Sequence, residues 1–425
     1  MNNTKENNMK KLISLVLALC LALCLFAGCG KTAEEDTAPA VQEEPAVEET
    51  EAPAAESPAT EEPAAEEASE PAGVGHGGTG YETYPADMVV ATVNGTDVTW
   101  MEYFYWLRYY TMYVQQFAAQ YGLVLDGWDA YDLSGENTNA QVVIMNAQAN
   151  LIQDHVIRTE TEKMGIALSE EDEAEILSIF EQNADSVTGD GDGVASEEEI
   201  QAFEGYLNSE MFVDRAFFDQ FNATAILSEL GFQMEYGENG EEFSDEDTLA
   251  FAEDNGLMGA KHILLLTVDA VTHEPLSEEE IAEKRQRADD LYAELSALTD
   301  DPDALEARFD ELTAEYTEDT GYAAYPDGYV FSEGEMVTAF EDAVKELEIG
   351  GLSEVVESEY GYHIILRIPI DPDAVIGTDA NGNNVTLRYA AATQQFSAQL
   401  GAWVDAAEVV WSDGFETPDL QAIFG

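Results

Sequence analysis

Apolar residues recur with helical spacing in two stretches near the C-terminal end of the chain. Ser277 and Glu280 form a capping box that opens the first stretch. Asp301-Pro302 opens the second, because an acidic N-cap followed by proline is a typical helix start. Two helices are therefore predicted. Their apolar faces consist of Ile281, Ala288, Leu291, Tyr292 and Leu295 in the first, and Leu305, Phe309, Leu312 and Tyr316 in the second.

A third apolar stripe and four β-prone runs surround these two helices. Residues 336–347 predict a third long helix, which Gly350-Gly351 terminates. The β-prone runs are residues 262–266, 329–331, 353–356 and 362–368. The resulting order is strand, two helices, strand, helix, strand, strand. It predicts an α+β fold in which helices pack on a sheet.

The preceding region, residues 85–257, is predicted to be mostly helical after a short hairpin. Asn94-Gly95 lies between two β-prone runs, as in a two-residue hairpin turn. The further helical segments are residues 140–163, 169–182, 196–221 and 245–255, with one more at 387–407 in the tail 371–425.

The long helix that follows the hairpin is unusually aromatic. It carries Phe104, Trp106, Tyr109, Tyr110, Tyr113, Phe117 and Tyr121. One buried stripe does not need so many rings. Core packing is the expected use, and a groove for a client polypeptide is the alternative.

An apolar run near the N-terminus has the flanks of an export signal. Lys5, Lys10 and Lys11 precede residues 12–26, a run too short for a comfortable membrane span. It ends in Leu25-Phe26-Ala27-Gly28-Cys29, which resembles a bacterial lipobox. The resemblance implies that residues 1–28 are a lipoprotein signal peptide and that Cys29 is lipidated, at the extracytoplasmic face of a bacterial membrane. An uncleaved hydrophobic anchor is the alternative.

Composition separates this signal from the folded part of the chain. Residues 29–84 are rich in Ala, Glu and Pro, so they predict a disordered acidic tether. The formal net charge of -72 argues against nucleic acid as a partner. It favours an unfolded or basic client, although solubility alone could account for it. No cysteine follows Cys29, which excludes disulfides, thiol nucleophiles and cysteine-bound zinc beyond that point.

Residues 188–199 imitate a calcium-binding loop. Asp190 and Asp192 stand at the third and fifth positions, and Glu199 stands at the twelfth. Thr188 replaces the usual first ligand. An acidic loop between helices is the expected interpretation, and a calcium site is the weaker alternative.

Four blocks in the α+β region resemble the parvulins, a family of peptidyl-prolyl isomerases. They are Lys261-His262-Ile263-Leu264-Leu265, Tyr316-Thr317-Glu318-Asp319-Thr320-Gly321, residues 334–343 and residues 360–367. The resemblance implies a four-stranded antiparallel sheet with about four helices over residues 258–370. It also implies catalysis of cis/trans exchange at X-Pro bonds without a cofactor.

The resemblance also implies roles for individual residues. His262 and His363 would form the paired imidazoles of the family, with Asp319 beside the substrate carbonyl and Ser358 bonded to the histidine pair. The positions matching the substrate pocket are Met336, Phe340, Phe331 at its rim, Tyr360 and Leu264. Ordinary core packing is the competing interpretation for the apolar residues and for a histidine in a strand.

Two segments depart from the family pattern. Residues 324–330 replace a Gly-Gly-Asp-Leu-Gly-Trp-like segment, which puts the usual leucine of the pocket in doubt. The loop 267–275 has no Lys or Arg, so it argues against selection of a phosphorylated residue before proline.

The start of the folded chain resembles the N-terminal domain of the PrsA and SurA foldases. That resemblance implies that the parvulin domain is inserted in a mostly helical chaperone domain, to which residues 371–425 return. The predicted function is a lipid-anchored foldase that isomerises X-Pro bonds in exported unfolded proteins. The alternatives are a holdase with a catalytically weak parvulin module and a calcium-binding surface protein.

Overall fold

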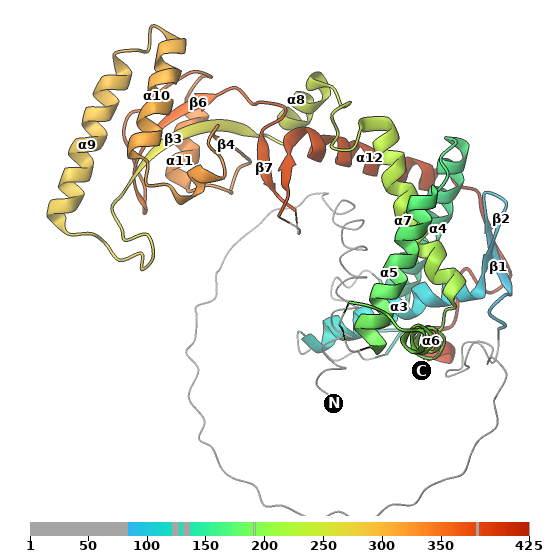
Figure 1. The fold of residues 1–425 in the computed structure, drawn as a ribbon. Helices are drawn as coiled ribbons and strands as arrows, with labels where there is room; N and C mark the ends of the chain where they lie inside the picture. The colour runs from blue at the N-terminus through green and yellow to red at the C-terminus, as the bar shows by residue number, and fades with distance from the viewer. Residues whose placement is uncertain are drawn as a thin grey trace, which may run out of the picture. The chain divides into compact units, whose positions relative to one another are not determined.

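The computed structural model describes residues 84–120, 127–130, 137–189, 191, 193–379 and 382–424 (Figure 1). The predicted signal peptide, the lipidation site Cys29 and nearly all of the tether 29–84 lie outside these residues, as do Asp190 and Asp192. The described chain forms two compact units. Unit 1 includes residues up to 156, 168–224 and from 407 onward, and unit 2 includes 157–167 and 225–406.

Unit 1 contains a small sheet that joins the two ends of the described chain. Strands β1 (Val89–Val93) and β2 (Thr96–Thr99) form the predicted hairpin, and β9 (Val409–Trp411) pairs antiparallel with β1. Asn94 and Gly95 have φ angles of 51° and 82°. These are the left-handed conformations that a two-residue hairpin turn requires. The hairpin is confirmed, and the pairing of β9 with β1 returns the C-terminal segment to the N-terminal one.

Helices make up the rest of unit 1. They are α3 (Trp100–Gln120), α4 (Asn139–Lys163), α5 (Glu170–Thr188), α6 (Glu197–Tyr206), the π-turn η1 (Leu207–Met211), α7 (Arg215–Tyr236) and α13 (Leu420–Phe424), with α4 and α7 continuing into unit 2. In α3, Trp100, Tyr103 and Trp106 are buried, while Tyr113 and Phe117 are 45% and 38% exposed. Core packing therefore uses the first half of this aromatic helix.

The single helix predicted over residues 196–221 is wrong. Phe212 adopts a left-handed conformation with φ of 61° and is buried, which ends the first helix. The Asp214 carboxylate then accepts the backbone N–H of Phe217 and starts α7. An aspartate at this place is a helix-start signal that the apolar periodicity concealed.

Unit 2 contains the predicted four-stranded sheet. Its strands are β3 (Met258–Leu266), β4 (Tyr329–Phe331), β5 (Val356–Glu357) and β6 (Gly361–Ile368), in the order β4-β3-β6-β5 with every pair antiparallel. Helices α9 (Glu278–Ser296) and α10 (Pro302–Tyr316) cover one face. Helix α11 (Thr338–Glu346) packs on the other, and a 3-10 turn η2 (Thr320–Ala323) follows α10. The α+β prediction is confirmed.

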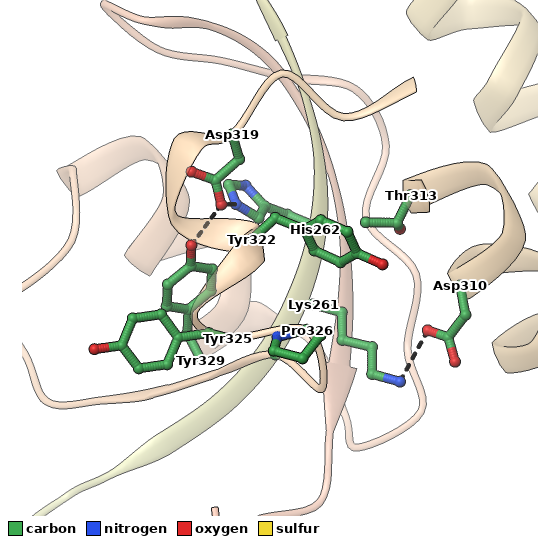
Figure 2. A pocket seen from close by; sticks show the side chains of 10 residues that line it. Lys261, His262, Asp310, Thr313, Asp319, Tyr322, Tyr325, Pro326 and Tyr329 are labelled. Atoms are coloured by element: carbon green, nitrogen blue, oxygen red, sulfur yellow. Dashed lines mark hydrogen bonds and ion pairs between the residues drawn. The ribbon is translucent and has the colours of Figure 1, made fainter. Parts of the chain in front are cut away.

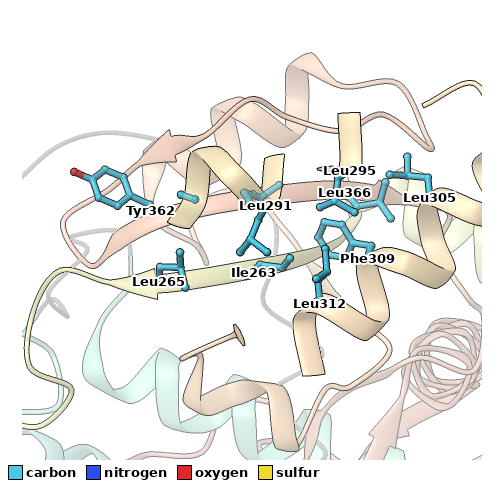
Figure 3. Close-up of a cluster of buried hydrophobic side chains, with 11 residues drawn as sticks. Ile263, Leu265, Leu291, Leu295, Leu305, Phe309, Leu312, Tyr362 and Leu366 are labelled. Atoms are coloured by element: carbon cyan, nitrogen blue, oxygen red, sulfur yellow. The ribbon is translucent and has the colours of Figure 1, made fainter. Parts of the chain in front are cut away.

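Side chains on alternate positions of β3 enter the two cores of this sheet. Ile263 and Leu265 point toward α9 and α10, whereas Met258 and Ala260 point toward α11. Figure 3 shows the first core, where the helices close over the strands. It consists of Ile263, Leu265, Ala288, Leu291, Leu295, Leu305, Phe309, Leu312, Tyr362, Ile364 and Leu366.

Local signals set where most of these helices begin. Ser277 and Glu280 form the predicted capping box, and the Asp301 side chain accepts the N–H of Ala304. Helix α11 is shorter than predicted. It has nine residues and ends at Glu346, because Leu347 is already extended, before Gly350 is reached. Met336 lies before the helix instead of within it.

Flanking segments complete unit 2. They are α8 (Asp245–Asp254), β7 (Val375–Thr378), β8 (Asn384–Thr386) and α12 (Leu387–Asp405). Ile157, Phe232, Phe396 and Leu400 share one core, so residues before and after the four-stranded sheet pack together. The sheet domain is thus inserted within a mostly helical framework. Across the part of the chain that the structure describes, every helix is too short or too polar to span a bilayer.

The core beneath α9 and α10 generates a stability prediction. Phe309 is fully buried there, so Phe309→Ala should lower the free energy of unfolding by about 3–5 kcal/mol. Urea denaturation followed by circular dichroism measures this loss. Val271→Ala is the control, since Val271 is 85% exposed and should change stability by less than about 0.5 kcal/mol. Equal effects of the two substitutions would contradict the described core.

Candidate active site

The two central strands of the sheet bring His262 and His363 together. His262 stands opposite Ile365, and His363 stands opposite Leu264, so both imidazoles project from the same face. Their Nδ1 atoms lie 3.1 Å apart, and their ring planes differ by only 12°. The histidines predicted to pair therefore do so, at hydrogen-bonding distance.

Asp319 approaches the pair from the start of η2. Its Oδ2 atom lies 3.0 Å from His262 Nε2, and its Oδ1 accepts the backbone N–H of Gly321 at 2.9 Å. The preceding residue, Glu318, donates its backbone N–H to the carbonyl of Leu264 at 2.8 Å. This bond ties the Asp319 segment to β3. Because the segment and His262 are anchored to the same strand, their separation is set by the backbone.

Ser358 contacts the other end of the histidine pair. Its hydroxyl lies 2.7 Å from His363 Nε2, on a turn that Gly361 closes by accepting the N–H of Ser358. A Cβ atom on Gly361 would lie 2.1 Å from the carbonyl oxygen of Leu265. Only glycine therefore permits this turn to press against β3 and deliver Ser358 to His363.

Burial and hydrogen bonding decide which of these groups carry charge. Burial would raise the pKa of Asp319, but hydrogen bonds from His262, Tyr329 and the Gly321 N–H outweigh it and lower the pKa to about 2. Burial, with the nearby His262, lowers the pKa of His363 to about 3. At neutral pH the carboxylate is therefore ionised and the buried imidazole is neutral.

The contacts link these four side chains by hydrogen bonds. The ionised Asp319 can only accept, so His262 Nε2–H donates to it. The two Nδ1 atoms share one hydrogen bond, and His363 Nε2 is bonded to the hydroxyl of Ser358. The result is a hydrogen-bonded chain from Ser358 through both imidazoles to Asp319.

Apolar side chains border this chain. The Phe340 ring is 5.2 Å from the His262 ring and 5.8 Å from the His363 ring, edge to face in both cases. Met336 is half-buried beside Phe340, and Leu264 is buried opposite His363. Apolar side chains thus adjoin the polar chain, but Phe340 is only 3% exposed, and the use of this cluster as a pocket for the proline ring stays a prediction.

Two further residues predicted to contact substrate differ in burial. Phe331 is 2% exposed and packs against Phe340, which is itself 3% exposed, so both belong to the core beneath α11, and the role of Phe331 at a pocket rim stays a prediction. Tyr360 is 39% exposed, and its ring lies 6.4 Å from the ring of His273. Among the described contacts, it reaches the histidine pair only through its backbone N–H, which donates to Ser358.

The candidate calcium loop is described only in part. The Glu199 carboxylate accepts the backbone N–H and the hydroxyl of Ser196, which completes a capping box on α6. This carboxylate therefore has a structural use. The other two candidate ligands, Asp190 and Asp192, lie outside the described residues.

Sequence analysis missed Tyr329. Its hydroxyl donates to Asp319 Oδ2 at 2.5 Å, and Figure 2 shows His262 and Tyr329 both directed at this carboxylate. A hollow adjoins His262 and Tyr329. It is lined by Lys261, His262, Asp310, Thr313, Asp319, Tyr322, Tyr325, Pro326, Gly328 and Tyr329. The available signal was the departure of residues 324–330 from the family pattern, a segment that includes this tyrosine.

Comparison with known families agrees with this geometry. Residues 262–368 match the family described as Rotamase: PPIC-type PPIASE domain. This segment is a parvulin-type peptidyl-prolyl isomerase domain. The match begins at His262 and includes Asp319, Ser358 and His363, the four members of the hydrogen-bonded chain.

Curated relatives include foldases and isomerases. Foldase protein PrsA of Halalkalibacterium halodurans is 36% identical over 128 residues, which are 30% of this chain and 32% of that protein. Peptidyl-prolyl cis-trans isomerase ESS1 of Saccharomyces cerevisiae is 34% identical over 107 residues, 25% of this chain and 62% of that protein. Each is matched over less than two-thirds of its own length. The crystal structure of PrsA from Bacillus cereus covers 80% of this chain and 100% of its own, at 17% identity and a TM-score of 0.27.

The buried histidine of the parvulin domain generates a pH prediction. His363 has a pKa of about 3 in the folded protein against an ordinary value of 6.5, so below pH 6.5 the unfolded chain binds more protons. Stability should therefore fall as the pH drops through this window. Between pH 7.5 and 5 the contribution of His363 is about 2 kcal/mol.

Urea unfolding of His363→Asn at the two pH values tests this difference. The variant should lose about 2 kcal/mol less than the wild type over this interval. His273→Asn replaces an exposed histidine and should keep the dependence of the wild type. If His363→Asn lost as much stability as the wild type, the imidazole would not be held neutral by burial.

Proposed function

We propose that this protein is a foldase, anchored to the extracytoplasmic face of a bacterial membrane, that isomerises X-Pro bonds in exported unfolded proteins. One observation carries the proposal. The hydrogen-bonded chain of Ser358, His363, His262 and Asp319 lies beside the buried Phe340 and the half-buried Met336. Such a site offers an apolar contact for a pyrrolidine ring and fixed polar groups for the adjoining carbonyl.

The chemistry of prolyl isomerisation suits this arrangement. Rotation about an X-Pro bond crosses a barrier of about 20 kcal/mol because the twisted amide loses its double-bond character. No covalent bond has to form or break. A catalyst needs only to bind the twisted amide more tightly than the planar one, through dipoles and charges that are already in place.

The division of charge along the chain serves that purpose. Asp319 supplies a fixed negative charge, His262 bonds it directly, and the neutral His363 bonds His262 in turn. Because each group has a bonding partner, little reorganisation accompanies rotation of the substrate. Ser358 acts through His363 in this proposal and does not attack the substrate.

The location of the protein is proposed from its N-terminal sequence. The apolar run 12–26 and the lipobox-like Leu25–Cys29 favour export and lipidation, and residues 29–84 favour an acidic tether. In this proposal a chaperone domain of residues 85–257 and 371–425 carries the parvulin domain, 258–370. Relatives named as PrsA foldases support a role in protein folding.

A holdase is the second candidate. Met112, Tyr113 and Phe117 on α3 are each between 38% and 45% exposed, and an apolar surface of this kind can hold an unfolded chain. The two candidates differ in their dependence on the histidine pair. A holdase would still suppress aggregation of an unfolded client after the pair was disrupted, and the wild type would not accelerate exchange in a proline tetrapeptide.

Isomerase activity is tested with a proline-containing tetrapeptide and the full-length chain. His262→Asn and Asp319→Asn should each lower kcat/KM on the order of 10- to 100-fold. The first removes the imidazole that bonds the Asp319 carboxylate, and the second removes the negative charge itself. His273→Asn is the matched control and should keep the activity. Unchanged rates in both site variants would overturn the catalytic proposal.

Membrane attachment is tested separately at Cys29. Cys29→Ala should abolish lipidation and move the protein from the membrane fraction to the soluble fraction of cells. Cys24→Ala lies within the same apolar run and should leave the attachment unchanged. If Cys29→Ala stayed with the membrane, an uncleaved hydrophobic anchor would be the better explanation.

A further inference from the structure

Tyr329 contacts the atom of Asp319 that also faces His262. The Tyr329 hydroxyl lies 2.5 Å from Asp319 Oδ2, and His262 Nε2 lies 3.0 Å from the same oxygen. Tyr329 is half-buried at the start of β4, opposite Ala260 on β3. Because Ala260 and His262 alternate on one face, the pairing of β4 with β3 brings the tyrosine toward the histidine. The two rings are 5.7 Å apart and nearly perpendicular.

The space around this hydroxyl is tightly limited. A Cβ atom on Gly321 would lie 2.2 Å from the Tyr329 hydroxyl oxygen. The same residue donates its backbone N–H to Asp319 Oδ1 at 2.9 Å. The absence of a side chain at position 321 therefore lets Gly321 and Tyr329 hold the two oxygens of one carboxylate. Tyr325 packs against the other side of the Tyr329 ring, with the centroids 5.1 Å apart.

Charged and titratable groups face Asp319 from several elements. His262 on β3 and Tyr329 on β4 bond it directly, and His363 on β6 lies one ring farther along the chain. Lys261 and Asp310 line the same hollow. Lys261 is paired with Asp310 at 2.9 Å and with Glu306 at 3.1 Å. The described hydrogen bonds to the Asp319 side chain thus come from His262, Tyr329 and Gly321.

Tyr329 is suited to be a permanent donor. Burial and the neighbouring carboxylate raise the pKa of its hydroxyl, which therefore keeps its proton at neutral pH. A hydrogen bond from a neutral donor to a carboxylate is strong and directional. Removing it would leave Asp319 free to rotate away from His262 and would favour its protonated form.

We propose that Tyr329 is a positioning residue, whose hydroxyl orients the ionised Asp319 toward the histidine pair, and that Gly321 is required to admit it. The assignment extends the proposed isomerase activity and rests on it. Tyr329 acts through Asp319 and not by binding the proline ring. Loss of the hydroxyl should therefore change the pH dependence of the reaction as well as its rate.

Tyr329→Phe in the full-length protein is the first test. We expect kcat/KM for a proline tetrapeptide to fall about 10-fold and the acidic limb of its pH profile to move up by about one pH unit. Tyr325→Phe removes the hydroxyl of the adjacent ring and should keep the profile of the wild type. A tyrosine that only packs would leave the acidic limb in place, and that result would overturn the assignment.

Gly321→Ala provides a second, independent test. Its methyl group should displace the Tyr329 hydroxyl and reproduce the shift of the pH profile. In the Tyr329→Phe background the hydroxyl is already gone, so Gly321→Ala should have a much smaller further effect. Such non-additivity is expected of residues that share one contact. Equal effects of Gly321→Ala in both backgrounds would contradict the proposed contact.

A measurement without substrate separates this inference from the proposed function. Carboxyl 13C NMR of the aspartates follows the ionisation of Asp319, whose signal is identified by its absence in Asp319→Asn. In the wild type the Asp319 carboxyl should titrate with a pKa of about 2, and Tyr329→Phe should raise that pKa by about one unit. If Tyr329→Phe raised the pKa of Asp319 but the wild type had no isomerase activity, the proposed function would be wrong and the proposed contact would be supported. An unshifted signal would overturn the role of Tyr329.

Discussion

The antiparallel pairing of β3 with β6 is the constraint on which the candidate site depends. It brings together His262 and His363, two residues far apart in sequence, and places both on one face of the sheet. A slip of one residue in this register would turn one imidazole to the opposite face and into the core beneath α9 and α10. The fully buried Ile263 and Phe309 oppose such a slip, because it would move apolar side chains out of that core. The packing on one face thereby maintains the chemistry on the other.

The polar chain on that other face illustrates how a buried site can hold a charge. Burial opposes ionisation of Asp319, yet three hydrogen bonds more than compensate for it. The same burial keeps His363 neutral. The site therefore has an ionised carboxylate at one end of the hydrogen-bonded chain, and the neutral His363 with its partner Ser358 at the other. A fixed dipolar arrangement of this kind needs no metal or nucleophile to favour a twisted amide over a planar one.

Segments that precede and follow the parvulin domain in sequence pack together. β9 pairs with β1, and Ile157, Phe232 and Phe396 share a core, although the parvulin domain lies between these segments in sequence. An inserted domain enters and leaves through neighbouring points of its host, so its own core can form independently.

The sequence by itself determined the features that local interactions decide. The caps at Ser277 and Asp301 and the turn at Asn94-Gly95 each depend on a few adjacent residues. The spaced parvulin blocks located His262, Asp319 and His363. Only the tertiary structure decided the burial of Phe331, the break at Phe212 and the contact of Tyr329 with Asp319. These depend on which side chains distant in sequence share a space. Periodicity along one segment reveals which face is apolar, but not what packs against it.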